Sequence, residues 1–166
     1  AAGGGRSYAA GGNALFLNPA SLAVTNQYIL GGGYTFARMS GSEKSYAHGL
    51  NVEWTDSTPN PLRLGMGLAY SYLMSDEENT SNVHGAMTYS LPFELVGVHL
   101  GVGVHWLQDY IKGLAASDDL WSFDAGISFN FQNQLTLGVV GHNIMNKPDN
   151  GLPRGVGTGI SYWLCP

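Results

Sequence analysis

The sequence predicts an all-β protein, specifically an antiparallel transmembrane β-barrel with about eight strands. Large apolar residues alternate with small or polar residues along repeated stretches of the chain, which is the period of a β-strand. Charged residues make up only 11% of the 166 residues, less than half of the usual share of about 25% in soluble domains. No apolar run approaches the roughly 18 to 20 residues of a spanning helix, so a helical membrane protein is excluded.

The clearest strand runs from Leu95 to Trp106, and its two faces are unlike each other. One face carries large apolar residues: Val96, Val98, Leu100, Val102, Val104 and Trp106. The other is mostly glycine and histidine: Leu95, Gly97, His99, Gly101, Gly103 and His105. The solvated face of a soluble sheet normally carries Lys, Glu and Thr. A large apolar face opposite a small polar one therefore indicates lipid on one side and a lumen on the other.

The same alternation predicts seven more strands, within residues 27–36, 46–54, 62–72, 82–91, 121–131, 135–142 and 156–164. Strands of about ten residues suffice to cross an outer membrane at a tilt. Two tight connections (91–93 and 132–134) and one of moderate length (56–60) are predicted to be periplasmic turns. The longer polar connections (38–45, 75–81, 108–119 and 145–153) are predicted to be extracellular loops. The alternative, a soluble sandwich or lipocalin-like barrel, would need a glycine-rich exterior with few charges, which is a poor solvent face.

The chain divides into an N-terminal segment, residues 1–25, and the barrel, residues 26–166. The first segment is rich in Gly, Ala and Asn, and we expect it to be irregular or briefly helical, either as a hatch or on the periplasmic side. The small residues at its start are typical of a chain cleaved after export. The net charge of −5 and the lack of a basic cluster argue against a nucleic-acid partner. The single cysteine, Cys165, cannot form an internal disulfide or a metal cluster, and we expect no cofactor.

Two stretches resemble a known family. The segment GGNALFLNPASLA (11–23) is similar to the N-terminal segment of the FadL-like transporters of fatty acids and hydrocarbons, and of the related PorV-like barrels of the type 9 secretion system. The run LGVVGHNI (137–144), with LPR (152–154) and GTGISY (157–162), resembles a late strand, its loop and the next strand in the same group. The resemblance implies a barrel that binds or passes a hydrophobic small molecule, with Asn18 and Pro19 in its hatch or gate. The PorV-like side implies instead a scaffold that holds a partner protein in the envelope.

The sequence also departs from this family. Ser21 stands where the family usually has Gly, the family barrels have about fourteen strands, and this chain ends in Trp163-Leu164-Cys165-Pro166 rather than on an aromatic residue. An eight-stranded barrel is filled by its own side chains and has no room for a hatch. Two alternatives follow: a reduced relative with the N-terminal segment outside the lumen, or strands that belong to a wider barrel.

Polar residues predicted to face the lumen are the candidate site. If Gln132 and Gln134 flank a tight turn, Asp124 lies opposite His142, and His105 approaches from the other neighbouring strand. Three interpretations stay open for this group: a zinc site, acid/base chemistry with a serine such as Ser122, and a hydrogen-bonded network that fixes register. We favour the network and assign neither a metal nor a catalytic residue, so an enzyme is the weakest of the functional classes.

Other inward residues have simpler predicted roles. His84 and His99 are expected to line the lumen, and Glu53 and Arg63 to form an inward ion pair on adjacent strands, since a lone charge there is costly. The acidic residues Asp76, Glu77, Glu78, Asp118 and Asp119 fit either a solvated loop or cation bridges to lipopolysaccharide. We therefore expect a protein of the bacterial outer membrane, in contact with the lipid bilayer and lipopolysaccharide, with a hydrophobic ligand or a protein partner.

Overall fold

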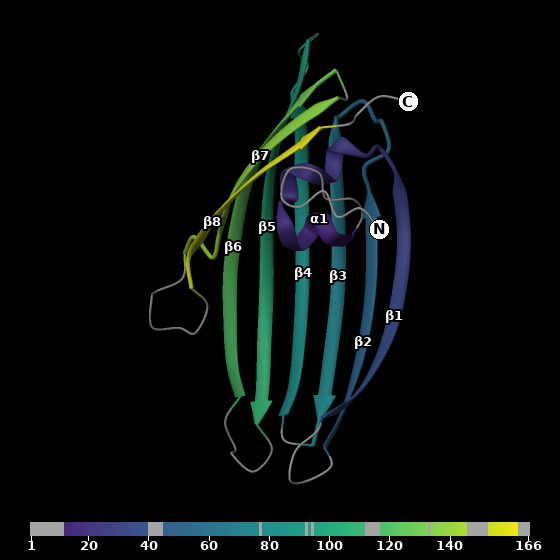
Figure 1. The fold of residues 1–166 in the computed structure, drawn as a ribbon, viewed down its shortest axis with the longest axis vertical. Coiled ribbons are helices and arrows are strands. Elements are labelled where there is room, and N and C mark those ends of the chain that lie inside the picture. Colours follow the sequence, from purple (N-terminus) through teal and green to yellow (C-terminus); the bar gives the residue numbers. More distant parts are fainter. Residues whose placement is uncertain are drawn as a thin grey trace.

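The structure is a computed structural model that describes residues 12–39, 45–76, 78–91, 93, 95–111, 117–132, 134–145 and 153–162. Two short helices precede a single antiparallel sheet whose eight strands follow one another in chain order (Figure 1). The elements are α1 (Gly12–Leu17), the 3-10 helix η1 (Pro19–Val24), β1 (Tyr28–Met39), β2 (Ser45–Asp56), β3 (Leu64–Ser75), β4 (Glu78–Leu91), β5 (Val96–Ile111), β6 (Ser117–Phe131), β7 (Leu135–His142) and β8 (Gly155–Tyr162).

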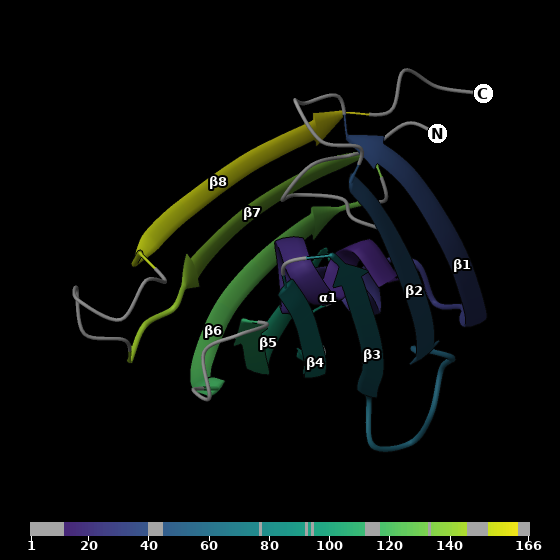
Figure 2. The ribbon, with the colours of Figure 1, turned by 90° about the horizontal axis from the view of Figure 1, so that it is seen from below.

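The sheet is strongly curved but it is not closed. Within the described residues β1 pairs only with β2 and β8 only with β7, so the all-β antiparallel prediction is confirmed and closure into a barrel is not observed. Figure 2 shows the strands as an arc with the helices in its hollow. We call the side that faces the helices the concave face and the opposite side the convex face.

The predicted alternation is confirmed by the burial of side chains. In β3, Gly65, Gly67 and Ala69 are buried on the concave face, whereas Met66 and Leu68 are exposed on the convex face. The same pattern makes the convex face a nearly continuous apolar surface over all eight strands. Its exposed members include Leu30, Tyr34, Leu50, Val52, Leu68, Tyr70, Met87, Tyr89, Leu100, Val102, Trp121, Phe123, Val139, Val156 and Ile160.

The predicted contrast between short turns and long loops is only partly right. The expected polar loop at residues 75–81 is wrong, because β3 continues to Ser75 and β4 already begins at Glu78. The strands β5 and β6 also extend through Ile111 and from Ser117, into residues expected to form a loop. Polar residues there join the ladder because backbone pairing does not require apolar side chains once neighbouring strands are in register.

The turn between β2 and β3 is longer than expected. Pro59 and Pro61 have no backbone N–H to give to a strand ladder. Asn60 instead organises the turn: its side chain donates to the carbonyl of Leu64 at 2.6 Å and accepts from the Leu64 N–H at 3.2 Å. Arg63 has a φ of 55°, in the left-handed region, which ends the turn just before β3.

The N-terminal helices lie against the concave face of the central strands. Helix α1 packs mainly on β3 and β4, and η1 on β4, β5 and β6. Their apolar residues Ala14, Leu15 and Leu22 form a buried cluster with Ala69. Asn18 begins η1 by accepting a hydrogen bond from the Ala20 N–H at 3.0 Å, followed by Pro19, a common first helical residue. No helix among the described residues has the length and apolar character needed to cross a membrane.

Candidate functional site

Glycines of the concave face form a seat for residues 12–24, which we call the plug. A Cβ atom added to Gly101 would lie 2.1 Å from the Ala20 nitrogen, and one added to Gly126 would lie 2.1 Å from Asn18 Oδ1. At Gly67 it would lie 2.7 Å from Leu15 Cδ2. A side chain at Gly101 would collide with the plug backbone, whereas at Gly126 and Gly67 it would collide with the side chains of Asn18 and Leu15. The glycine face of the strands therefore lets the plug backbone approach the sheet directly.

Polar contacts hold the plug at the same place. Asn18 is fully buried, and its Nδ2 lies 3.5 Å from Ser128 Oγ, at the distance limit of a hydrogen bond. Ser21 Oγ also lies 3.5 Å from Ser128 Oγ, and the Thr88 hydroxyl donates to the carbonyl of Pro19. Asn18 and Pro19, the two residues predicted for a hatch or gate, thus lie in the middle of the concave face against β4 and β6.

The predicted neighbours Asp124 and His142 contact each other. Phe131 pairs with Leu135 and Ala125 with Gly141, which is the register that the tight-turn prediction requires. His142 Nδ1 lies 3.1 Å from Asp124 Oδ2, and the Asp124 side chain is only 2% exposed. The other carboxylate oxygen accepts from the Asn143 N–H at 2.9 Å. The carboxylate is thus held from two sides by consecutive residues at the end of β7.

His84, which is expected to line the lumen, lies beside this group on the concave face. It pairs directly with His105 across β4 and β5, and their rings meet edge to face with centroids 4.8 Å apart. Each of His84, His105 and Asp124 places one potential ligand atom within 4.8 Å of the others. The Phe16 ring of α1 covers His84 at 4.7 Å. We call His84, His105, Asp124 and His142 the histidine cluster.

Asn143 contacts the histidine cluster, and the sequence had not singled it out as a site residue. Its Oδ1 accepts from Ser122 Oγ at 2.8 Å and lies 2.9 Å from His105 Nε2, while its Nδ2 donates to the carbonyl of Pro153 at 2.9 Å. The Ser122 hydroxyl thus contacts Asn143 and not a histidine, unlike the nucleophile of a serine–histidine pair. Asn143 has a φ of 55°, and asparagine after a strand is a known signal for this conformation.

The remaining predicted site residues lie elsewhere. His99 is buried, and its Nδ1 lies 2.9 Å from Ser90 Oγ, outside the histidine cluster. The predicted ion pair of Glu53 and Arg63 is wrong for the described structure. Glu53 pairs with Ala69, six residues beyond Arg63, or roughly 20 Å along the strand. The turn after β2 includes residues that we predicted to lie in the next strand. Arg63 is therefore exposed at the end of this turn.

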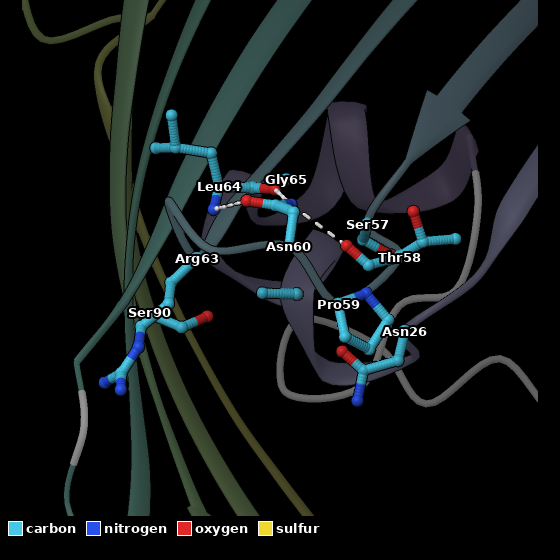
Figure 3. Close-up of a pocket in the computed structure, with 10 residues that line it drawn as sticks. Asn26, Ser57, Thr58, Pro59, Asn60, Arg63, Leu64, Gly65 and Ser90 are labelled. Atoms are coloured by element: carbon cyan, nitrogen blue, oxygen red, sulfur yellow. Dashed lines mark hydrogen bonds between the residues drawn. The ribbon is translucent and has the colours of Figure 1, made fainter.

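A pocket of about 330 Å³ lies where the plug ends, beside the turn from β2 to β3. Figure 3 shows polar side chains around it, and its lining residues are Ala23, Asn26, Ser57, Thr58, Pro59, Asn60, Arg63, Leu64, Gly65 and Ser90. Near it, hydrogen bonds from the side chain and the backbone N–H of Thr58 lower the pKa of the Asp56 carboxyl. Most of the lining residues are polar or charged, whereas cavities that bind lipids are lined predominantly by apolar side chains.

In comparisons with protein-family models, with curated proteins and with solved structures, nothing matches this chain. The resemblance to FadL-like and PorV-like barrels therefore stays a prediction from the residues that carry it.

Proposed function

We propose that this chain forms part of the wall of an outer-membrane β-barrel, and that its plug controls the binding or passage of a hydrophobic small molecule. The observation that carries the proposal is the inverted polarity of the sheet. Large apolar side chains are exposed on the convex face, Leu30 by 70% and Trp121 by 61%, whereas Thr88, Ser122 and Ser128 are buried on the concave face. Lipid is the environment in which this arrangement is stable.

Aromatic pairs near one end of the sheet support an interface with lipid head groups. Phe36 stacks on Tyr46 across β1 and β2 with centroids 5.8 Å apart, and Trp106 stacks on Trp121 across β5 and β6 at 6.1 Å. Both pairs lie toward the end where β1 and β5 finish. Such belts are typical of membrane barrels, because aromatic rings have an apolar body and a polar edge.

A sheet within a membrane must satisfy both of its edges, because no water is present to bond the free backbone groups. The proposal therefore requires partner strands for β1 and β8. A direct test is gel migration before and after boiling, which differs for closed barrels. A chain that migrates identically and stays soluble without detergent would contradict the proposal.

Control by the plug is tested by locking it to the wall. Ser21 and Ser128 are fully buried with their hydroxyl oxygens 3.5 Å apart, which suits a disulfide between Ser21→Cys and Ser128→Cys in a Cys165→Ser background. We expect oxidised protein in vesicles to take up a fluorescent fatty acid more slowly than reduced protein. The matched control is the Ser21→Cys single variant, in which oxidation should change nothing. Equal uptake by the locked and the reduced double variant would exclude gating by the plug.

A second candidate is a scaffold barrel that holds a protein partner in the envelope. The observation that favours it is the filled concave face: the plug is seated with Asn18 fully buried, and the pocket beside it is polar. The two candidates differ in a measurement on wild-type protein. Transport predicts saturable binding of the fatty-acid probe, whereas a scaffold predicts no binding and an envelope protein that co-purifies in fixed ratio.

A further inference from the structure

The histidine cluster contains a set of metal-binding groups on three adjacent strands. His84 on β4 pairs with His105 on β5, and Gly103 on β5 pairs with Asp124 on β6. The three side chains share the concave face, and their potential ligand atoms all lie within 4.8 Å of one another. Zinc ligands in a tetrahedral site lie roughly 3.3 Å apart, so small side-chain rotations suffice to bring these atoms around one ion.

An independent observation comes from His84. Its side chain is buried, with 2% of the residue exposed, and neither ring nitrogen has a hydrogen-bond partner. Buried polar atoms are nearly always bonded, so two unbonded nitrogens on one ring call for an explanation. Gly103 keeps the space beside the ring open, since a Cβ there would lie 3.6 Å from both His84 Nε2 and Asp124 Cβ. The unpartnered imidazole therefore faces the carboxylate across a glycine.

Asn143 prepares His105 to act as a ligand. Because Asn143 Nδ2 donates to Pro153, its Oδ1 must face Ser122 and His105 and can only accept. His105 Nε2 therefore carries the proton, which leaves Nδ1 as the nitrogen with a free lone pair. A ligating histidine that donates its other N–H to a fixed oxygen is the usual arrangement in metal sites.

Asp124 is held in the same manner. The Asn143 N–H and His142 Nδ1 each contact one carboxylate oxygen, at 2.9 and 3.1 Å. Each oxygen keeps a lone pair for an ion, and the two contacts fix the orientation of the carboxylate. His142 is therefore a positioning residue for Asp124.

We propose that His84, His105 and Asp124 bind one divalent transition-metal ion, with zinc the best match. Two imidazoles and one carboxylate suit zinc, whereas Ca²⁺ and Mg²⁺ prefer oxygen ligands throughout. Three protein ligands leave a fourth position for water or for another ligand. Because Phe16 covers His84, the ion lies beneath α1 and joins β4, β5 and β6 under the plug. The site does not depend on whether any molecule passes the plug.

The test uses the full chain purified in detergent, stripped with a chelator and dialysed against zinc or cobalt. We expect one equivalent of zinc by mass spectrometry of the metal, and the intense visible absorption of four- or five-coordinate Co²⁺. His84→Gln, His105→Gln and Asp124→Asn should each weaken zinc binding at least tenfold. His142→Gln, which removes only a positioning contact, should weaken it by roughly 10- to 100-fold with the cobalt spectrum shifted but not abolished.

His99→Gln is the matched control, because His99 is also buried on the concave face but has its own partner, Ser90. This variant should bind zinc as the wild type does. Wild-type protein that retains no zinc, or ligand variants that retain it equally, would overturn the proposal. X-ray absorption of the zinc-loaded wild type gives a result that does not depend on how variants fold. Outer-shell scattering from two imidazole rings supports the site, and a spectrum without imidazole scattering overturns it.

Discussion

The convex and concave faces of the sheet require different residue types, and β5 illustrates the two requirements. On its convex face Leu100 and Val102 are 43% and 55% exposed. On its concave face His99 is 8% exposed, and Gly101 and Gly103 are buried. The convex face needs only apolar side chains, whereas the concave face needs particular small or polar residues at particular positions.

Glycine on the concave face therefore has a packing role. A glycine in the interior of a strand normally destabilises the strand. The glycine raises the backbone entropy of the unfolded chain and has no side chain to pack. Here Gly67, Gly101 and Gly126 remove the Cβ atoms that would collide with the plug. We therefore expect larger side chains to destabilise the protein when they are placed on the concave face, and charged side chains to destabilise it when they are placed on the convex face. Substitutions on the two faces, and in the plug, should differ in their effect on stability.

Loss of a buried side chain of the plug itself should have the largest effect. Leu22 is 2% exposed and belongs to the buried cluster, so Leu22→Ala should lower the free energy of unfolding by about 2–5 kcal/mol. Leu30→Ala, at a convex position that is 70% exposed, should change it by less than about 1 kcal/mol. Guanidinium unfolding in detergent measures both. Equal effects would mean that the plug is not packed on the sheet.

A charge on the convex face distinguishes lipid from water as its surroundings. Val102→Arg should lower stability in phospholipid vesicles by about 2–4 kcal/mol if the position lies near the bilayer midplane. In a soluble protein the same exposed substitution would change stability by about 0.5 kcal/mol or less. Leu62→Arg, in the turn and 70% exposed, is the control and should have little effect in either case. A negligible effect of Val102→Arg would count against the membrane proposal.

The glycine seat is tested by adding a single methyl group. Gly101→Ala places a Cβ against the plug backbone and should destabilise the chain by about 1–3 kcal/mol, with faster proteolysis of the N-terminal segment. Gly85→Ala is the matched control on the neighbouring strand, because its Cβ meets only Val104 and Leu68 side chains, at 3.7 and 3.9 Å. Equal losses of stability in the two variants would show that the close approach of the plug to Gly101 does not contribute to stability.

The smallest effect should come from the cap of η1. Asn18→Ala removes the acceptor for the Ala20 N–H and should cost about 0.5–2 kcal/mol. In that background Gly126→Ala should destabilise less than it does in the wild type, because the colliding Oδ1 atom is gone. A double-mutant cycle on the free energy of unfolding measures this coupling. Strict additivity would show that Asn18 and Gly126 do not meet.

Much of the sheet could be predicted because its signals are local. Alternation along each strand assigned the faces, and the tight turn at residues 132–134 predicted the register that brings Asp124 to His142. The composition of residues 1–25 led us to expect an irregular or briefly helical segment, and residues 12–24 form two short helices. Each of these features depends on residues that are neighbours in sequence or across one hairpin.

The features that the sequence did not predict depend on several strands and turns at once. The register between β4 and β5 decides that His84 meets His105, and the path of the chain after β7 decides that Asn143 joins them. The turn after β2 moved Arg63 away from Glu53, because its two prolines and Asn60 lengthened it. None of these outcomes has a signal in the alternation of a single strand.

Local residue order is enough to make strands with one apolar and one small, polar face, because side-chain direction alternates with a period of two whatever the surroundings. The use of the small face depends on how the strands and helices pack together. Curvature of the sheet and the packing of the plug place Asn18 over Gly126 and Phe16 over His84, and these contacts join residues more than sixty positions apart. Such contacts depend on how the whole sheet bends, which no local pattern encodes.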